Sequence, residues 1–385
     1  MSGIGRIVLW GSVGVAALLL IAGTAWLWSL PSTPAAAAAP AIDAAERVAT
    51  LAALKPPKRA RPLVAIIGLN DATETTDYLM PYGILKRADM ADVTLLATAA
   101  GAVRLFPALT VEPDATIAEF DRRHPDGADY VVVPAMSRDD DPVVLEWLRR
   151  QAAKGATVIG ICAGAKVVAA AGLLDGRRGT THWYSVAELR RRHPAMHYVA
   201  DRRLVVDRDV ATTTGISASM PMMLTLIEAV AGRARAEAVA QELGLASWDA
   251  RHRSDAFVFT RPFAQTAIVN SLAFWRWETL RLDLAAVPDE VTLALVADAW
   301  SRTYRSRIVA FAGAPGPVTT RNGLRVVPDK VGTEPGDGPP IPAFAQHGPV
   351  GALDRTLDAI AGRHGSATAS FVAMQLEYAR PPSTR

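Results

Sequence analysis

Short apolar segments alternate with segments of helical periodicity along residues 62–245. Four of them, LVAIIGL, DVTLLATA, ADYVVVPAM and ATVIGICAG, have the length and composition of buried strands. The segments TDYLMPYGILKRA and DPVVLEWLRRQAAKG lie between them and have the apolar spacing of helices. Such alternation builds βαβ units, whose parallel strands are covered on both faces. The sequence therefore predicts an α/β fold with a parallel sheet between two layers of helices.

The single cysteine of the chain, Cys162, follows the last of these strands and precedes a helix. This position is the carboxyl edge of the sheet, where open α/β sheets bind ligands, and the small residues 163–165 permit the tight turn of a nucleophile elbow. A helix N-terminus lowers the pKa of a thiol, so we expect an enlarged thiolate fraction unless an ionised carboxylate nearby opposes it. The alternative is an inert core cysteine.

Several motifs occur in an order that resembles a known family. They are TDYLMPYGILKRAD near the start, ICAG around Cys162, GTTHW at 179–183 and TTTGISASMPMMLTLIEAVAG at 212–232. Together they resemble the DJ-one/PfpI superfamily of class I glutamine-amidotransferase-like domains. The combination AGLLDGRRGTTHW is most similar to the N-terminal domain of AraC-type, amidase-like regulators. The resemblance implies a flavodoxin-like parallel sheet with a nucleophile elbow.

The resemblance also implies a set of site residues. Cys162 corresponds to the elbow nucleophile, Asp77 to the carboxyl group beside its sulfur, and His182 to the histidine near the thiol. A carboxyl group next to a thiol titrates together with it, and a histidine there could act as a general base or as a donor to an oxyanion. We therefore expect Asp77 within hydrogen-bond reach of Cys162. A buried, satisfied histidine is the alternative for His182.

Two features limit this chemistry. Many family members have a Gly-Gly pair after the third strand, where this chain has Ala135 and Met136, so a backbone oxyanion hole is harder to form. Asp139, Asp140 and Asp141 are consecutive, which is typical of a solvated helix start rather than of a metal site. We predict neither a metal nor a cofactor.

The N-terminal residues 7–30 contain no charge and exceed the roughly 20 residues that a membrane-spanning helix needs. Trp10 at one end and Trp26 and Trp28 at the other resemble interfacial anchors. The expectation is a single-pass anchor in the inner (plasma) membrane, with the soluble part periplasmic. A cleaved signal peptide is the alternative, because residues 35–39 are all alanine.

Residues beyond 246 contain a segment that is similar in sequence to part of the first half. The segment 308–329 aligns without a gap on 93–114 at a constant offset of about 215 positions. No strand, cysteine and helix follow it, so we predict a smaller, decayed second copy without a nucleophile. The predicted division is a transmembrane anchor (1–31), an Ala/Pro-rich linker (32–61), a DJ-one/PfpI-like domain (62–245) and a degenerate repeat-like region (246–385).

The sequence predicts a small-molecule or redox sensing and regulatory module built around Cys162. The alternative is a cysteine-dependent enzyme, a hydratase, amidase or glyoxalase-like protein that acts on a small electrophile. The expected partners are a small-molecule ligand or substrate, the lipid bilayer through residues 7–30 and, in a homodimer, a second copy of the chain. With 41 basic against 38 acidic residues, and no basic recognition helix after residue 246, nucleic acid is not an expected partner.

Overall fold

A computed structural model describes residues 3–35, 37–332, 337–342, 344 and 346–379. Its central sheet has seven strands, and each neighbouring pair is parallel except the antiparallel pair of β11 and β12. The predicted α/β fold with a parallel sheet is confirmed. In order across the sheet, the strands are β11 (Leu204–Asp207), β12 (Val210–Thr213), β8 (Thr157–Gly160), β7 (Tyr130–Val133), β1 (Leu63–Gly68), β3 (Asp92–Ala97) and β6 (Ala115–Thr116).

Both faces of this sheet are covered by helices. Val64 and Ile66 of β1 belong to one apolar cluster, whereas Ala65 and Ile67 belong to another, as the two-residue period of a strand requires. The first face is covered by α3 (Thr75–Ala88) and α8 (Ser219–Ala231), and the second by α4 (Ile117–Arg123), α5 (Pro142–Ala153) and α6 (Gly164–Ala170).

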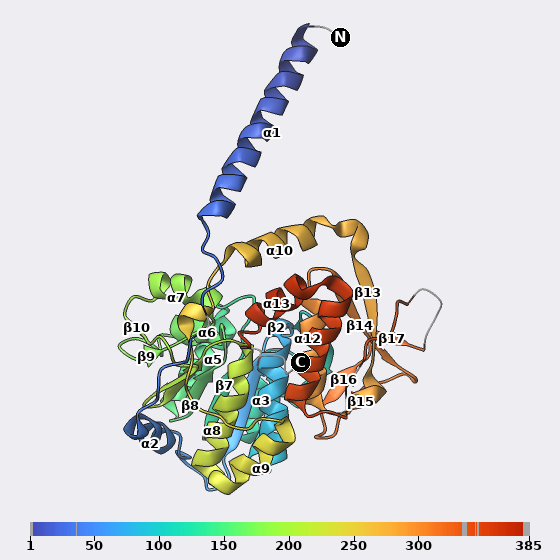
Figure 1. Ribbon diagram of the computed structural model, residues 1–385. Coiled ribbons are helices and arrows are strands. Elements are labelled where there is room, and N and C mark those ends of the chain that lie inside the picture. The colour runs from blue at the N-terminus through green and yellow to red at the C-terminus, as the bar shows by residue number, and fades with distance from the viewer. Residues whose placement is uncertain (1–2, 36, 333–336, 343, 345, 380–385) are drawn as a thin grey trace.

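The C-terminal residues form a second α/β unit beside the first (Figure 1). Helix α11 contacts both α3 and strand β14, so it lies between the two units, and one apolar cluster runs through them. The second parallel sheet consists of β13 (Glu278–Asp283), β14 (Ser306–Ala312) and β17 (Lys330–Val331). The helices are α10 (Arg261–Leu272), α11 (Glu290–Ser301), α12 (Pro349–His364) and α13 (Ser366–Gln375).

A five-stranded sheet joins the two units. Its strands in order are β15 (Val318–Thr319), β16 (Arg325–Val327), β5 (Thr110–Glu112), β4 (Val103–Phe106) and β2 (Asp71–Glu74). Helix α2 (Ala44–Ala53) packs on α8 and β11. The other elements are α7 (Val186–Arg192), α9 (Arg233–Leu243), β9 (Arg178–Gly179) and β10 (His197–Tyr198). The predicted linker thus contains a helix that is part of the body.

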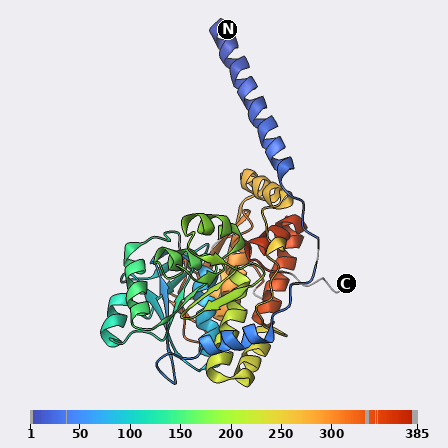
Figure 2. The same cartoon turned by 90° about the vertical axis from the view of Figure 1, so that its left-hand side faces the viewer.

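The uncharged N-terminal segment forms helix α1 (Gly3–Ser29), which stands away from the body in both views (Figures 1 and 2). Among the described residues, no helix is both long enough and apolar enough to cross a membrane. The predicted transmembrane anchor over residues 7–30 is therefore wrong. The predicted bilayer partner and the single-pass inner-membrane location depended on that anchor and are corrected with it.

Candidate functional site around Cys162

Cys162 lies in a tight turn between β8 and α6. Its φ is +56°, a left-handed conformation that is uncommon for a residue other than glycine. Two threonines hold this turn: the N–H of Cys162 donates to Oγ1 of Thr213 at 3.0 Å, and Oγ1 of Thr181 donates to the carbonyl of Cys162 at 3.0 Å. Gly164 is required here, because a Cβ on it would lie 2.1 Å from the carbonyl oxygen of Val133. The turn thus has the strained geometry of an elbow at the carboxyl edge of the sheet.

Two buried carboxyl groups at the start of α3 lie at this edge. Asp77 is in the first turn of α3, and its Oδ2 accepts a hydrogen bond from the N–H of Ala135 at 3.1 Å. Glu74 caps the same helix, since its Oε2 accepts from the N–H of Asp77 at 2.6 Å and from Oγ1 of Thr76 at 2.8 Å. Sequence reasoning missed Glu74, although an acidic residue just before a helix is a recognisable N-cap signal.

Asp77 does not form the expected hydrogen bond to the thiol. The hydrogen bonds among the described residues include none between Asp77 and Cys162, and Oδ1 of Asp77 is buried without a partner. The N–H of Ala135, which a backbone oxyanion hole would need, is directed at Asp77 instead. The carbonyl of Ala135 accepts from the N–H of Glu74 at 3.0 Å. Both backbone polar groups of Ala135 are therefore used to bind residues at the start of α3.

The C-terminal unit contributes charged side chains to the same cluster. Arg302, which follows α11, donates to Oε1 of Glu74 at 2.6 Å and to Oδ2 of Asp298 at 2.7 Å. Burial by itself lowers the pKa of Arg302, but the negative charges of Asp298 and Glu74 outweigh that effect and raise it. The guanidinium is therefore a permanent positive charge beside the buried carboxyl groups.

Burial dominates the titration of these acids. Burial, together with the charge of Asp298, raises the pKa of Glu74 from 4.5 to about 7, and Arg302 opposes this rise. Burial and the charge of Glu74 raise the pKa of Asp77 well above its usual value. Glu74 therefore titrates near neutral pH, and the carboxyl group of Asp77 keeps its proton to a higher pH than an ordinary aspartate does.

The thiol of Cys162 is not activated. Cys162 is 6% exposed. Burial raises the pKa of its thiol well above the usual value, and the charges of Asp77 and Glu74 raise it further. The N–H of Ala163 acts in the opposite direction and is outweighed. The expected enlarged thiolate fraction is therefore wrong in direction, because the turn is buried and shares its site with two acids.

His182 faces the C-terminal residues and makes no hydrogen bond to Cys162 among the described residues. Its Nε2 lies 3.0 Å from the carbonyl oxygen of Gln375, and its Nδ1 accepts from the N–H of Tyr184 at 3.3 Å. A carbonyl oxygen only accepts, so Nε2 bears the proton and the ring is the neutral tautomer. Burial lowers the pKa of His182 in agreement with this. Both ring nitrogens are thus occupied in this conformation.

Residues 374–377, here named the C-terminal clasp, bind the loops beside the site. Oε2 of Glu377 accepts from the N–H of Gly215 at 2.6 Å and from that of Trp183 at 3.3 Å, while Oε1 lies 2.9 Å from Nε2 of His252. Nε1 of Trp183 donates to the carbonyl of Met374 at 2.8 Å. The clasp therefore binds both loops next to the elbow. No local motif indicates it, since its partners lie far away in the sequence.

A cavity of about 410 Å³ adjoins the clasp. Thr181, Trp183, Tyr198, Ser254 and Glu377 are among its lining residues, whereas Cys162 is not. Thr181 connects the cavity with the elbow, because it lines the cavity and donates to the backbone carbonyl of Cys162. A ligand of small-molecule size fits such a space.

The aspartates after β7 stabilise local structure. Asp141 caps α5 by accepting from the N–H of Val143 at 3.1 Å, as the predicted helix start requires. Asp139 forms ion pairs with Lys166 at 2.7 Å and Arg192 at 3.0 Å. These partners are cations, so Asp139 serves an ion-pair network on the surface.

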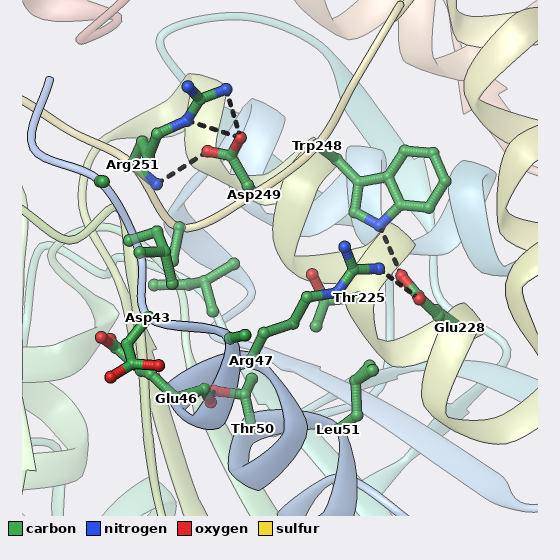
Figure 3. A pocket seen from close by; sticks show the side chains of 15 residues that line it. Asp43, Glu46, Arg47, Thr50, Leu51, Thr225, Glu228, Trp248, Asp249 and Arg251 are labelled. Atoms are coloured by element: carbon green, nitrogen blue, oxygen red, sulfur yellow. Dashed lines mark hydrogen bonds and ion pairs between the residues drawn. The ribbon is translucent and has the colours of Figure 1, made fainter. Parts of the chain in front are cut away.

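A separate cavity of about 340 Å³ lies under α2 (Figure 3). Several of its polar groups bind one another: Arg47 donates to Glu228 at 2.5 Å, Trp248 donates to the same carboxylate at 3.1 Å, and Arg251 pairs with Asp249 at 2.7 Å. We assign this cavity to the packing of α2 against α8.

An elbow cysteine at the carboxyl edge of a parallel sheet, with an acid from the first helix beside it, defines a class of α/β proteins. Residues 64–229 match the family profile of DJ-1/PfpI, and this part of the chain is a DJ-1/PfpI family domain. The match agrees with the resemblance of the sequence motifs.

Several proteins are similar to parts of the chain. The HTH-type transcriptional regulator CdhR of Pseudomonas aeruginosa is 36% identical over 104 residues, which are 27% of this chain and 31% of that protein. The isonitrile hydratase of Pseudomonas putida is 35% identical over 105 residues, 27% of this chain and 44% of that protein. The chain thus matches less than half the length of these curated relatives. A solved DJ-1 superfamily protein from Salmonella typhimurium has 26% identity and a TM-score of 0.43, with 48% of this chain and 100% of that chain covered.

Proposed function

We propose that the Cys162 site is a small-molecule sensing module, in which a ligand in the adjoining cavity displaces the C-terminal clasp. The observation that supports this most directly is the closure of the site. Cys162 is buried, its pKa is raised, and Glu377 ties the two neighbouring loops together. The similar regulator of Pseudomonas aeruginosa makes a regulatory role consistent with the domain.

Small-molecule sensing is favoured over sensing of oxidants. Oxidant-sensing cysteines are accessible and have a lowered pKa, because the thiolate is the species that reacts. Cys162 has the opposite properties in the clasped conformation. Oxidation would therefore require the clasp to open first.

The second candidate is a cysteine-dependent enzyme that acts on a small electrophile. The strained turn at Cys162 favours it, since nucleophiles of elbow enzymes adopt this conformation. The similar isonitrile hydratase of Pseudomonas putida supports it as well. Against it stand the protonated thiol and the N–H of Ala135, which is already bound to Asp77.

The two candidate functions differ in whether the ligand is converted to product: an enzyme would convert it and a sensing module would not. The full chain is mixed with an alkyl isonitrile or with methylglyoxal, and both product formation and the rate of Cys162 alkylation by iodoacetamide are measured. Cys162 is the sole thiol, so alkylation reports this site alone. Sensing predicts a changed alkylation rate without product. Product that disappears in Cys162→Ser would favour the enzyme, and an unchanged rate without product would contradict both for these ligands.

A further inference from the structure

Strands β5 and β16 pair in a register that relates two equivalent segments. At the offset of 215 found in the sequence, Thr110, Val111 and Glu112 correspond to residues 325, 326 and 327. In the antiparallel pair, Val111 lies opposite Val326, its own equivalent, and Glu112 lies opposite Arg325, the equivalent of Thr110. Only a two-fold rotation through the Val111–Val326 pair produces this exchange.

The same offset relates the structure inside each unit. Leu96 pairs with Ala115 between β3 and β6, and Phe311 pairs with Lys330 between β14 and β17, each position shifted by 215. The side chain of Asp114 accepts from the N–H of Leu95 at 2.7 Å, and that of Asp329 accepts from the N–H of Ala310 at 2.8 Å. The first helix of each unit, α3 or α11, precedes these strands.

Helices α3 and α11 meet across the same two-fold relation. Arg87 in the last turn of α3 forms an ion pair with Asp289, the N-cap of α11. In the same way, Arg302 after α11 forms an ion pair with Glu74, the N-cap of α3. The two helices are therefore antiparallel, with a reciprocal ion pair at each end. They approach closely at Gly83, where a Cβ would lie 2.6 Å from Oε1 of Glu290.

We infer that residues 278–331 are a second copy of residues 62–116 that occupies the place of a partner subunit, and that this copy supplies Arg302 to the Cys162 site as a positioning residue. Arg302 acts through Glu74, which in turn binds the N–H of Asp77. The counterpart pair, Arg87 with Asp289, has no cysteine beside it, because no strand–Cys–helix unit follows the second copy. A single chain thus contains both halves of a symmetric interface and one complete site.

The first test compares the two symmetry-related arginines. Cys162 alkylation by iodoacetamide is measured against pH in the full chain and in Arg302→Met, Arg302→Lys and Arg87→Met. At the high pH where the thiol ionises, Glu74 has lost its proton. In Arg302→Met the negative charge of Glu74 is no longer offset by the guanidinium, so the midpoint of the alkylation profile should rise. We expect a higher midpoint in Arg302→Met, recovery in Arg302→Lys and no change in Arg87→Met. Equal shifts in the two methionine variants, or none, would overturn the assignment of Arg302.

The second test needs no change at Arg302. In a Cys162→Ser background, Glu112→Cys and Arg325→Cys are introduced together, because these residues are partners in the β5–β16 register. Oxidation should give an intrachain disulfide at the mass of one chain, and Glu112→Cys alone should give no cross-link. A two-chain product of the double variant, or no disulfide at all, would overturn the pairing of the two copies within one chain.

Discussion

The carboxylate of Glu377 accepts a hydrogen bond from the backbone N–H of Gly215 at 2.6 Å, although 162 positions separate the two residues in the sequence. This bond holds the C-terminal clasp on the loop that follows β12. Only glycine fits at position 215, because a Cβ there would lie 2.4 Å from Cβ of Glu377. Residues near the C-terminus thus bind the loop that follows β12.

Loss of the Glu377 carboxylate should open the site. A hydrogen bond to a charged group contributes about 1.5–3 kcal/mol, so Glu377→Ala should increase the rate of Cys162 alkylation by roughly tenfold or more. Iodoacetamide kinetics at constant pH measure this rate. Glu237→Ala, which removes an exposed partner of Arg233, is the matched control and should leave the rate unchanged. Equal rates for both variants would show that the clasp does not limit access.

The stability of the protein should depend on pH through Glu74. Its pKa is about 7 in the folded chain, against the usual 4.5 of a glutamate in an unfolded chain, so the folded state binds more protons between these values. The free energy of unfolding should therefore fall as the pH rises from about 4.5 to 7, by about 3 kcal/mol at most for this group. Denaturant unfolding at several pH values should show a weaker decline in Glu74→Gln. The exposed Glu146→Gln should keep the full decline; if Glu74→Gln kept it too, the assignment would be wrong.

Replacement of His182 distinguishes a general base from a clasp contact. Both ring nitrogens are bound to backbone groups near the clasp, so His182→Gln should not slow Cys162 alkylation at any pH. We expect a rate at least equal to that of the natural chain, because the contact with Gln375 is weakened. His193→Gln serves as the control. A slower reaction with a shifted pH midpoint would identify His182 as a base for the thiol.

The elbow should not tolerate a side chain at position 164. Gly164→Ala forces a Cβ against the carbonyl of Val133, and such overpacking should destabilise the chain by about 3 kcal/mol. Gly362→Ala is the control, because no atom lies within 4 Å of a Cβ at that helical position. Its stability should rise by roughly 0.5–1 kcal/mol. Thermal denaturation distinguishes the two, and equal effects would contradict the close approach at the elbow.

The sequence predicts those parts of the fold that depend on local patterns. Apolar runs between helical segments predict the parallel sheet, and small residues around Cys162 predict its turn. Arg302 and Glu377 could not be predicted in this way, because their roles arise from contacts with Glu74 and Gly215 across 228 and 162 positions. The predicted lowering of the thiol pKa was wrong for the same reason, because burial in the folded structure outweighs the local effect of a helix start.

The pairing of β5 with β16 also affects how the interface between the two units can change through mutation. In a dimer of identical subunits, each substitution appears on both sides of the two-fold axis at once. Here Val111 and Val326 are separate codons of one gene, so each side can be altered alone. One unit can lose its cysteine-bearing strand while the other keeps it, and the ion pair at one end of the helices can be tuned without disturbing the pair at the other end.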